Sequence, residues 1–170
     1  NLKVLKNKDN EITDLVDIKS MPTIKDLLSH TAGFTYGFLG DAVAQEYDRV
    51  QLFHSEITTL EDEINLLSTL PLLCQPSTEW VYSVSVDILA RIIEVVTKNN
   101  LQSELKERIF YPLEMHSTGF TVDLKNHEYI MTSYEYNPLA KKIERPIAGT
   151  QKVGDIGYPS NKLSYARGGH

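Results

Sequence analysis

The sequence predicts an α-rich α+β fold in which helices come first and a β-hairpin follows. Between residues 22 and 120, apolar residues recur at helical spacing in segments separated by capping residues, glycine and proline. After Gly119 the pattern changes to two short strand-like stretches around a turn at Asn137 and Pro138. We therefore expect one domain-like unit, with residues 1–21 as a lead-in loop, 22–120 as a helical part, and 121–170 as a hairpin followed by coil.

Start and stop signals define most of the expected helices. Thr23 suits an N-cap, and Asp26 stands three residues later, as in a capping box. Thr59 is the expected cap of a later helix that Pro71 stops, and Pro112 stops the last one. The helices expected beside the central one begin at Thr23 and cover about 38–53, 60–70 and 101–110.

The most apolar helix is expected within STEWVYSVSVDILARIIEVVTK, which runs from Ser77 to Lys98. Its four charged positions follow one another at steps of four, three and four, which forms a narrow polar ridge on an otherwise apolar helix. These positions are Asp87, Arg91, Glu94 and Lys98. Such a helix is expected to be buried on most sides at the centre of its domain, with Ser83 or Ser85 as its cap.

Tyr82 comes one to three residues before this helix and is the candidate catalytic residue. A side chain at the end of a rigid central element is well positioned, and the helix dipole favours negative charge at that end. Two interpretations are open from the residues alone. Tyr82 is either a half-buried core aromatic with a satisfied hydroxyl or a general base held at a helix end.

Composition limits the classes of partner. The net charge of −6 and the pI near 5.3 argue against nucleic acid, because phosphate binding needs a basic face. No apolar run approaches the roughly 20 residues of a membrane helix. The single cysteine, Cys74, is expected to be a buried small hydrophobe, and His30 is expected to make a structural hydrogen bond at its turn. We expect no metal role for His30, because no second ligand is predicted at helical spacing from it, and the other histidines are scattered. We also expect no cofactor, because GDIG precedes no helix.

Three segments resemble serine β-lactamase-like hydrolases, the group that includes class C β-lactamases, DD-peptidases of the penicillin-binding type and related serine esterases. TIKDLLSHTAGF is similar to the family's LLSHTSG stretch, QPSTEWVYSVSVDILARIIEVVTK to its PGTxFxYSN segment, and LKERIFYPLEMHSTGF to its IFxPLGM segment. The match covers about Pro22 to Phe120. It implies that the chain is the mainly helical part of a β-lactamase-like (DD-peptidase-like) fold.

The resemblance implies an acyl-enzyme reaction on an ester, a β-lactam or a D-alanyl peptide. Tyr82 matches the tyrosine of the family's Tyr-x-Asn motif, which takes and returns the proton of a nucleophilic serine. The family's Ser-x-x-Lys motif lies well before the SHTAG stretch, and its third motif would lie beyond His170. We therefore expect an internal fragment that is inactive alone, from a parent acting on small-molecule or peptidoglycan-like substrates. The resemblance favours an extracytoplasmic location, while compartment and oligomeric state are left open.

Two departures from the family pattern matter. Val84 replaces the asparagine expected to hold the amide of a β-lactam side chain, which favours an esterase or an unassigned hydrolase. Ser77 replaces the glycine of the Pro-Gly-Thr turn, where a positive φ would suit serine poorly. Two alternatives stay open: a catalytically dead relative that binds peptidoglycan-like or peptide ligands, and a helical interaction module. The neighbouring coding sequence would separate all three.

Overall fold

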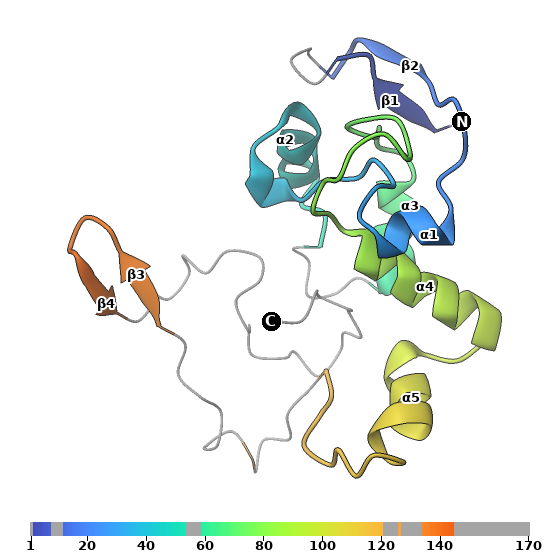
Figure 1. Cartoon of the computed structure of the whole chain (residues 1–170), viewed down its shortest axis with the longest axis vertical. Helices are drawn as coiled ribbons and strands as arrows, with labels where there is room; N and C mark the ends of the chain where they lie inside the picture. The colour runs from blue at the N-terminus through green and yellow to red at the C-terminus, as the bar shows by residue number, and fades with distance from the viewer. Residues whose placement is uncertain (1, 8–11, 54–58, 121–125, 127–133, 145–170) are drawn as a thin grey trace.

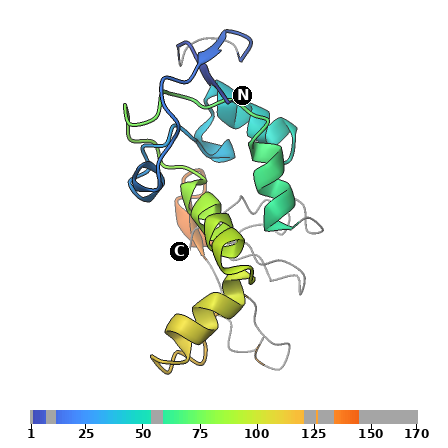
Figure 2. The same cartoon turned by 90° about the vertical axis from the view of Figure 1, so that its right-hand side faces the viewer.

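The computed structural model describes residues 2–7, 12–53, 59–120, 126 and 134–144. It is helix-rich, with two small antiparallel sheets. Both views show the β1–β2 hairpin at one end, α5 at the opposite end and α4 between them (Figures 1 and 2). The helices are α1 (Ile24–Leu28), α2 (Ala42–Arg49), α3 (Leu60–Leu67), α4 (Ser85–Thr97) and α5 (Leu101–Leu105), with a 3-10 turn η1 (Gly37–Leu39) and a π-type turn η2 (Lys106–Phe110). The strands are β1 (Lys3–Leu5), β2 (Leu15–Asp17), β3 (Glu135–Asn137) and β4 (Lys142–Glu144). Within these described residues, no helix is both long enough and apolar enough to cross a bilayer.

The lead-in of residues 1–21 contains a pair of short strands, which the sequence pattern did not predict. β1 and β2 pair antiparallel, with Val4 opposite Val16. The other edge of β1 is hydrogen-bonded to the segment around Leu72: the Leu5 N–H donates to the Leu72 carbonyl at 2.9 Å. Val4 and Leu72 are both fully buried. Strands of three residues are too short to show the alternation by which a strand is found in a sequence.

The predicted helix caps of α1 and α3 are confirmed. The side chains of Thr23 and Thr59 each accept a hydrogen bond from the backbone N–H of the aspartate three residues later. The carboxylate of that aspartate in turn accepts a hydrogen bond from the backbone N–H of the capping threonine. α2 is shorter than the expected 38–53 helix, because Asp41 caps it by accepting from the Ala44 N–H at 2.8 Å. The expected 101–110 helix is present as α5 continued by η2.

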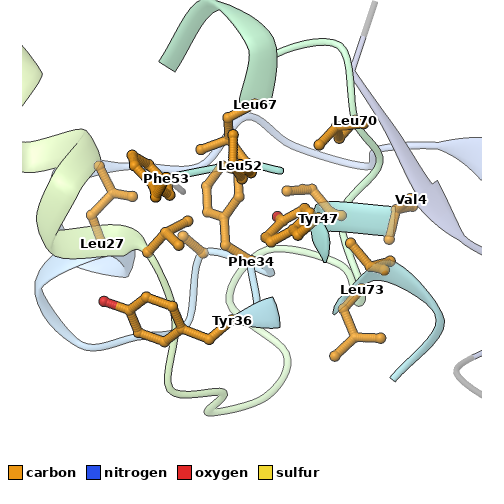
Figure 3. Packing of buried hydrophobic residues seen from close by; sticks show 14 of the residues in the cluster. Val4, Leu27, Phe34, Tyr36, Tyr47, Leu52, Phe53, Leu67, Leu70 and Leu73 are labelled. Carbon is orange, nitrogen blue, oxygen red and sulfur yellow. The ribbon is translucent and has the colours of Figure 1, made fainter. Parts of the chain in front are cut away.

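The hydrophobic core lies between β1, α1, α2, α3 and the chain that follows α3. Figure 3 shows rings and aliphatic side chains from these elements and from the segments after α1 and α2 packed together, with Tyr36 at the edge of the cluster. Tyr47, Leu67 and Leu72 are each at most 2% exposed. The buried members that the close-up labels are Val4, Leu27, Phe34, Tyr36, Tyr47, Leu52, Phe53, Leu67, Leu70 and Leu73.

α4 is not the most buried helix, which corrects the prediction from its periodicity. Only Ser85, Asp87 and Ala90 of this helix are buried, while Val96 is 74% exposed. The polar ridge faces the rest of the chain, because Arg91 pairs with Glu61 of α3 and with Glu94 of α4 itself. Apolar periodicity identifies which side of a helix is apolar, but it does not show that this chain covers that side.

The predicted C-terminal hairpin is present within the described part of the chain. β3 and β4 pair antiparallel, with Tyr136 opposite Ile143, and the turn begins at Asn137 as expected. The Asn137 side chain accepts from the Leu139 and Ala140 N–H groups at 3.0 Å, which closes the turn. In Figure 1 this hairpin stands apart from the helices. The coil predicted for 145–170 lies outside the described residues.

Candidate active site

Two segments far apart in sequence are joined into one platform, defined as residues 30–36 and 73–84. The N–H groups of Ser77, Val81 and Val84 donate to the carbonyls of Thr31, His30 and Thr35, at 2.8, 2.9 and 3.3 Å. The Leu73 N–H also donates to the Gly33 carbonyl at 2.8 Å. These are the SHTAG and WVYSVS stretches that the sequence analysis singled out. Backbone bonds of this kind hold side chains on both segments in fixed relative positions.

Gly33 makes the close approach of the two segments possible. Its φ of +91° lies in the region that favours glycine, and a Cβ there would stand 2.3 Å from the Cys74 carbonyl oxygen. Any larger residue would therefore force the segments apart. Cys74 itself is 6% exposed, which confirms the prediction of a buried small side chain.

Asp26 ties α1 to the Ser77 turn. Its carboxylate accepts from the Ser77 hydroxyl at 2.5 Å and from the Thr31 hydroxyl at 3.2 Å, in addition to the capping box with Thr23. The hydrogen bonds from Ser77 and Thr23 hold the pKa of Asp26 well below its usual range. Ser77 has a φ of +64°, so the turn does require the unfavourable conformation predicted for it. The bond to Asp26 offsets part of that strain.

Tyr82 lies half-buried on this platform, three residues before α4 begins. Its ring lies between those of His30 and Tyr36, with centroids 5.1 Å away on each side and interplanar angles of 52° and 47°. Tilted ring pairs at this spacing are favourable and restrict the middle ring. The predicted position before the helix is therefore confirmed, and the structure adds the two flanking rings.

The groups that flank Tyr82 are uncharged near neutral pH. Burial lowers the pKa of His30, so its imidazole is neutral at pH 7. Burial raises the pKa of Tyr36, and the Asp87 carboxylate, which accepts a hydrogen bond from it, raises that pKa further. Neither flanking ring therefore brings positive charge to Tyr82 at pH 7.

The serines around Tyr82 hold His30 and do not cap α4. Ser83 Oγ lies 3.2 Å from His30 Nδ1 and 2.8 Å from Ser85 Oγ, which confirms the predicted structural bond of His30. Val84 is the N-cap residue, and no side chain bonds the helix start there, so the predicted serine cap is wrong. The hydroxyls of Ser83 and Ser85 bond each other instead, and the Ser83 hydroxyl also bonds His30. Although a serine next to a histidine resembles a nucleophile with its base, Ser83 and Ser85 are 1% and 0% exposed and no substrate can reach them.

Val84, which replaces the family's asparagine, has its side chain buried at 1% exposure. It offers neither a donor nor an acceptor beside Tyr82. The site therefore lacks the side chain that the resemblance assigned to recognition of a β-lactam amide.

One Ser-x-x-Lys spacing does occur in the chain, at Ser103 and Lys106, although this motif was expected only outside it. These residues lie on α5 and η2, at the far end of α4 from Tyr82 (Figure 1). The 13 residues of α4 separate them, which corresponds to roughly 20 Å of helix. A shallow hollow lined by Arg91, Glu94 and Lys98 also lies at that end. Neither feature is part of the site at Tyr82.

A comparison of the sequence with protein-family models identifies the family. The model described as Beta-lactamase matches residues 14–159. The chain belongs to the Beta-lactamase family. The resemblance of the three sequence segments to serine β-lactamase-like hydrolases is therefore confirmed.

Three known proteins show what this Beta-lactamase family chain is similar to. Lovastatin esterase of Penicillium rubens is 34% identical over 98 residues, which cover 58% of this chain and 24% of the esterase. Protein Rv1367c of Mycobacterium tuberculosis is 32% identical over 112 residues, covering 65% and 27%. The solved structure of EstCE1, a hydrolase with promiscuous acyltransferase activity, superposes with a TM-score of 0.68 at 28% identity, covering 84% of this chain and 36% of EstCE1. The chain thus spans about a quarter of the length of these curated relatives.

The rings around Tyr82 are the part of the site that sequence reasoning missed. Trp80 packs edge-on against His30 at 6.3 Å, and Phe38 stacks on Tyr36 at 5.1 Å. The signal available was the density of aromatic residues in GFTYGF and EWVYS. No periodicity connects these two stretches, so only the fold shows that they meet.

Proposed function

We propose that this Beta-lactamase family chain forms part of a serine hydrolase that cleaves carboxylic esters through an acyl-enzyme, and that Tyr82 transfers the protons. The observation that carries the proposal is the position of Tyr82, half-buried between two rings on a platform that backbone hydrogen bonds hold rigid. The nucleophilic serine and its lysine belong, on this proposal, to a Ser-x-x-Lys outside these 170 residues, because Ser103 and Lys106 are at the wrong end of α4.

The proposed reaction assigns Tyr82 four proton transfers. As a tyrosinate it accepts the serine proton while the serine oxygen attacks the ester carbonyl. It then donates that proton to the leaving alcohol as the acyl-enzyme forms. In the second half it accepts a proton from the attacking water and returns one to the serine oxygen as the acid leaves. The anion would be favoured by the N-terminus of α4 and by the lysine of the Ser-x-x-Lys motif.

Two observations favour an ester over a β-lactam as the substrate. The apolar, buried Val84 cannot bind the amide of a β-lactam side chain. Lovastatin esterase, one of the relatives, is by its name an esterase. A catalytically dead relative that binds ligands without turnover is the second candidate, and the experiment below separates the two.

The test is Tyr82→Phe in the full-length protein that carries this chain. The substitution keeps the ring and its packing on His30 and Tyr36 but removes the hydroxyl. Because general acid–base groups contribute about 10² to 10⁴ in rate, p-nitrophenyl acetate turnover should fall at least about a hundredfold while the melting temperature hardly changes. Tyr111→Phe is the matched control, since Tyr111 is 59% exposed beyond α5 and should leave turnover unchanged.

Two results would contradict the proposal. A wild-type protein without ester turnover would favour the dead relative, and unchanged turnover in Tyr82→Phe would favour a purely structural tyrosine. Labelling by a fluorophosphonate adds a check on the nucleophile. The modified residue should be a serine other than Ser83, Ser85 or Ser103.

A further inference from the structure

Five aromatic rings form a continuous series of contacts with Tyr82 in the middle, which we call the aromatic arc. The order is Trp80, His30, Tyr82, Tyr36 and Phe38, and the successive centroid distances are 6.3, 5.1, 5.1 and 5.1 Å. The residues come from both platform segments and from η1. The arc is therefore a product of the fold and extends the site on both sides of the proposed proton carrier.

Within this chain, the two ends of the arc are exposed while its inner members are buried or half-buried. Trp80 is 68% exposed and Phe38 is 49% exposed, whereas Tyr36 is 9% exposed and His30 and Tyr82 are half-buried. Large exposed aromatic side chains beside a candidate reactive group are characteristic of ligand sites, where rings supply apolar area and a few polar groups set orientation.

Each exposed ring packs on a neighbouring ring, and the backbone beside it is hydrogen-bonded. Phe38 lies in η1, stacks on Tyr36, and is followed by Leu39, whose N–H donates to the Tyr36 carbonyl at 3.0 Å. Trp80 packs on His30 and is followed by Val81, whose N–H donates to the His30 carbonyl at 2.9 Å. Restraints of this kind lower the entropy lost when a ligand binds.

We propose that Trp80 and Phe38 mark apolar subsites on the two sides of Tyr82, and that one of these subsites binds a large hydrocarbon group of the ester substrate and determines its specificity. This inference rests on the proposed function and deepens it by naming the substrate class: esters with a large apolar acyl or alcohol group, in preference to small ones. The hydrocarbon group covers one of the two exposed rings while the ester carbonyl lies next to the hydroxyl of Tyr82.

The test compares Trp80→Ala and Phe38→Ala in the full-length protein on two pairs of esters. One pair varies the acyl group, p-nitrophenyl octanoate against p-nitrophenyl acetate, and the other varies the alcohol, 2-naphthyl acetate against ethyl acetate. In at least one pair, kcat/KM for the large ester should fall about tenfold relative to the small one, because pockets discriminate apolar groups by roughly 10- to 200-fold. The pair that responds identifies which side of the ester binds the arc.

The controls separate a subsite from a structural role. Tyr111→Ala, which removes an exposed ring far from the arc, should leave both ratios unchanged. Trp80→Phe should restore part of the preference for the large ester. An equal loss on large and small esters, or no loss on either, would overturn the subsite, since rings that only pack against other parts of the protein do not discriminate by ester size.

A binding measurement keeps this proposal separate from the proposed function. Octanoate or 1-octanol should bind the wild type saturably in calorimetry and should bind Trp80→Ala or Phe38→Ala more weakly, whereas acetate and ethanol should not bind. If the wild type shows no ester turnover but one of the two long ligands gives this difference, the hydrolase proposal fails and the subsite stands. If neither long ligand binds, or if both variants bind it as the wild type does, the subsite is wrong whether or not esters are cleaved.

Discussion

Replacing Gly33 by alanine should separate the two segments that hold Tyr82. Both Gly33 and Gly40 have a positive φ, +91° and +79°, but a Cβ at Gly33 meets the Cys74 carbonyl oxygen at 2.3 Å while a Cβ at Gly40 meets nothing within 4 Å. For Gly40→Ala, only the left-handed conformation is unfavourable, which costs about 1 to 2 kcal/mol. Gly33→Ala adds the loss of the Leu73 to Gly33 hydrogen bond, worth about 1 kcal/mol, for a total of about 2 to 3 kcal/mol.

The assay is urea unfolding of the full-length protein, with Gly40→Ala as the matched control. The Gly33 variant should lose more unfolding free energy than the Gly40 variant by about 1 kcal/mol or more, and its ester turnover should fall as well. Equal losses of stability in the two variants would refute the reasoning, because the close approach to Cys74 would then contribute nothing.

Two further predictions concern the Asp26 and Ser77 pair. Ser77→Ala should destabilise the protein by about 1 to 2 kcal/mol because it leaves the Asp26 carboxylate with one partner fewer, whereas Ser77→Gly should cost less because glycine relieves the φ of +64°. Urea midpoints of the two variants check this order, and a glycine variant less stable than the alanine variant would contradict it. The pKa of Asp26 is lower in the folded protein than its ordinary value of 3.8. Its ionised form therefore contributes fully to the free energy of unfolding above pH 3.8, and this contribution is lost as the pH falls toward the pKa of the folded state. The stability difference between wild type and Asp26→Asn should therefore narrow between pH 7 and pH 3, and a constant difference would show that the pKa is not depressed.

Local signals in the sequence predicted the parts of the fold that depend on local chemistry. Thr23 and Thr59 were identified as caps because a capping box needs only four consecutive residues. The positive φ of Ser77 was anticipated because the family has glycine there. The hairpin at Asn137 followed from its turn residues.

Features that depend on contacts between distant residues could not be predicted in this way. The periodicity of α4 was correct, but Asp87 is buried and Val96 is exposed, because the orientation of a helix depends on what the rest of the fold places against it. Tyr82 was identified before the helix, whereas its neighbours Tyr36 and His30 were not connected with it. They lie about fifty residues earlier in the chain and have no shared spacing that a sequence pattern could reveal.

The platform also has a consequence for the order of events during folding. The side-chain bonds that hold the platform join residues 51 and 53 positions apart, Asp26 of α1 with Ser77 and His30 with Ser83. Closing loops of that length loses chain entropy before any contact is gained, so such contacts form slowly compared with α2 or α3. Tyr82 therefore acquires its flanking rings only when α2 and α3, which lie between the two segments, have collapsed onto the core. During refolding, recovery of function should follow the slowest phase of core formation rather than the early appearance of helical signal.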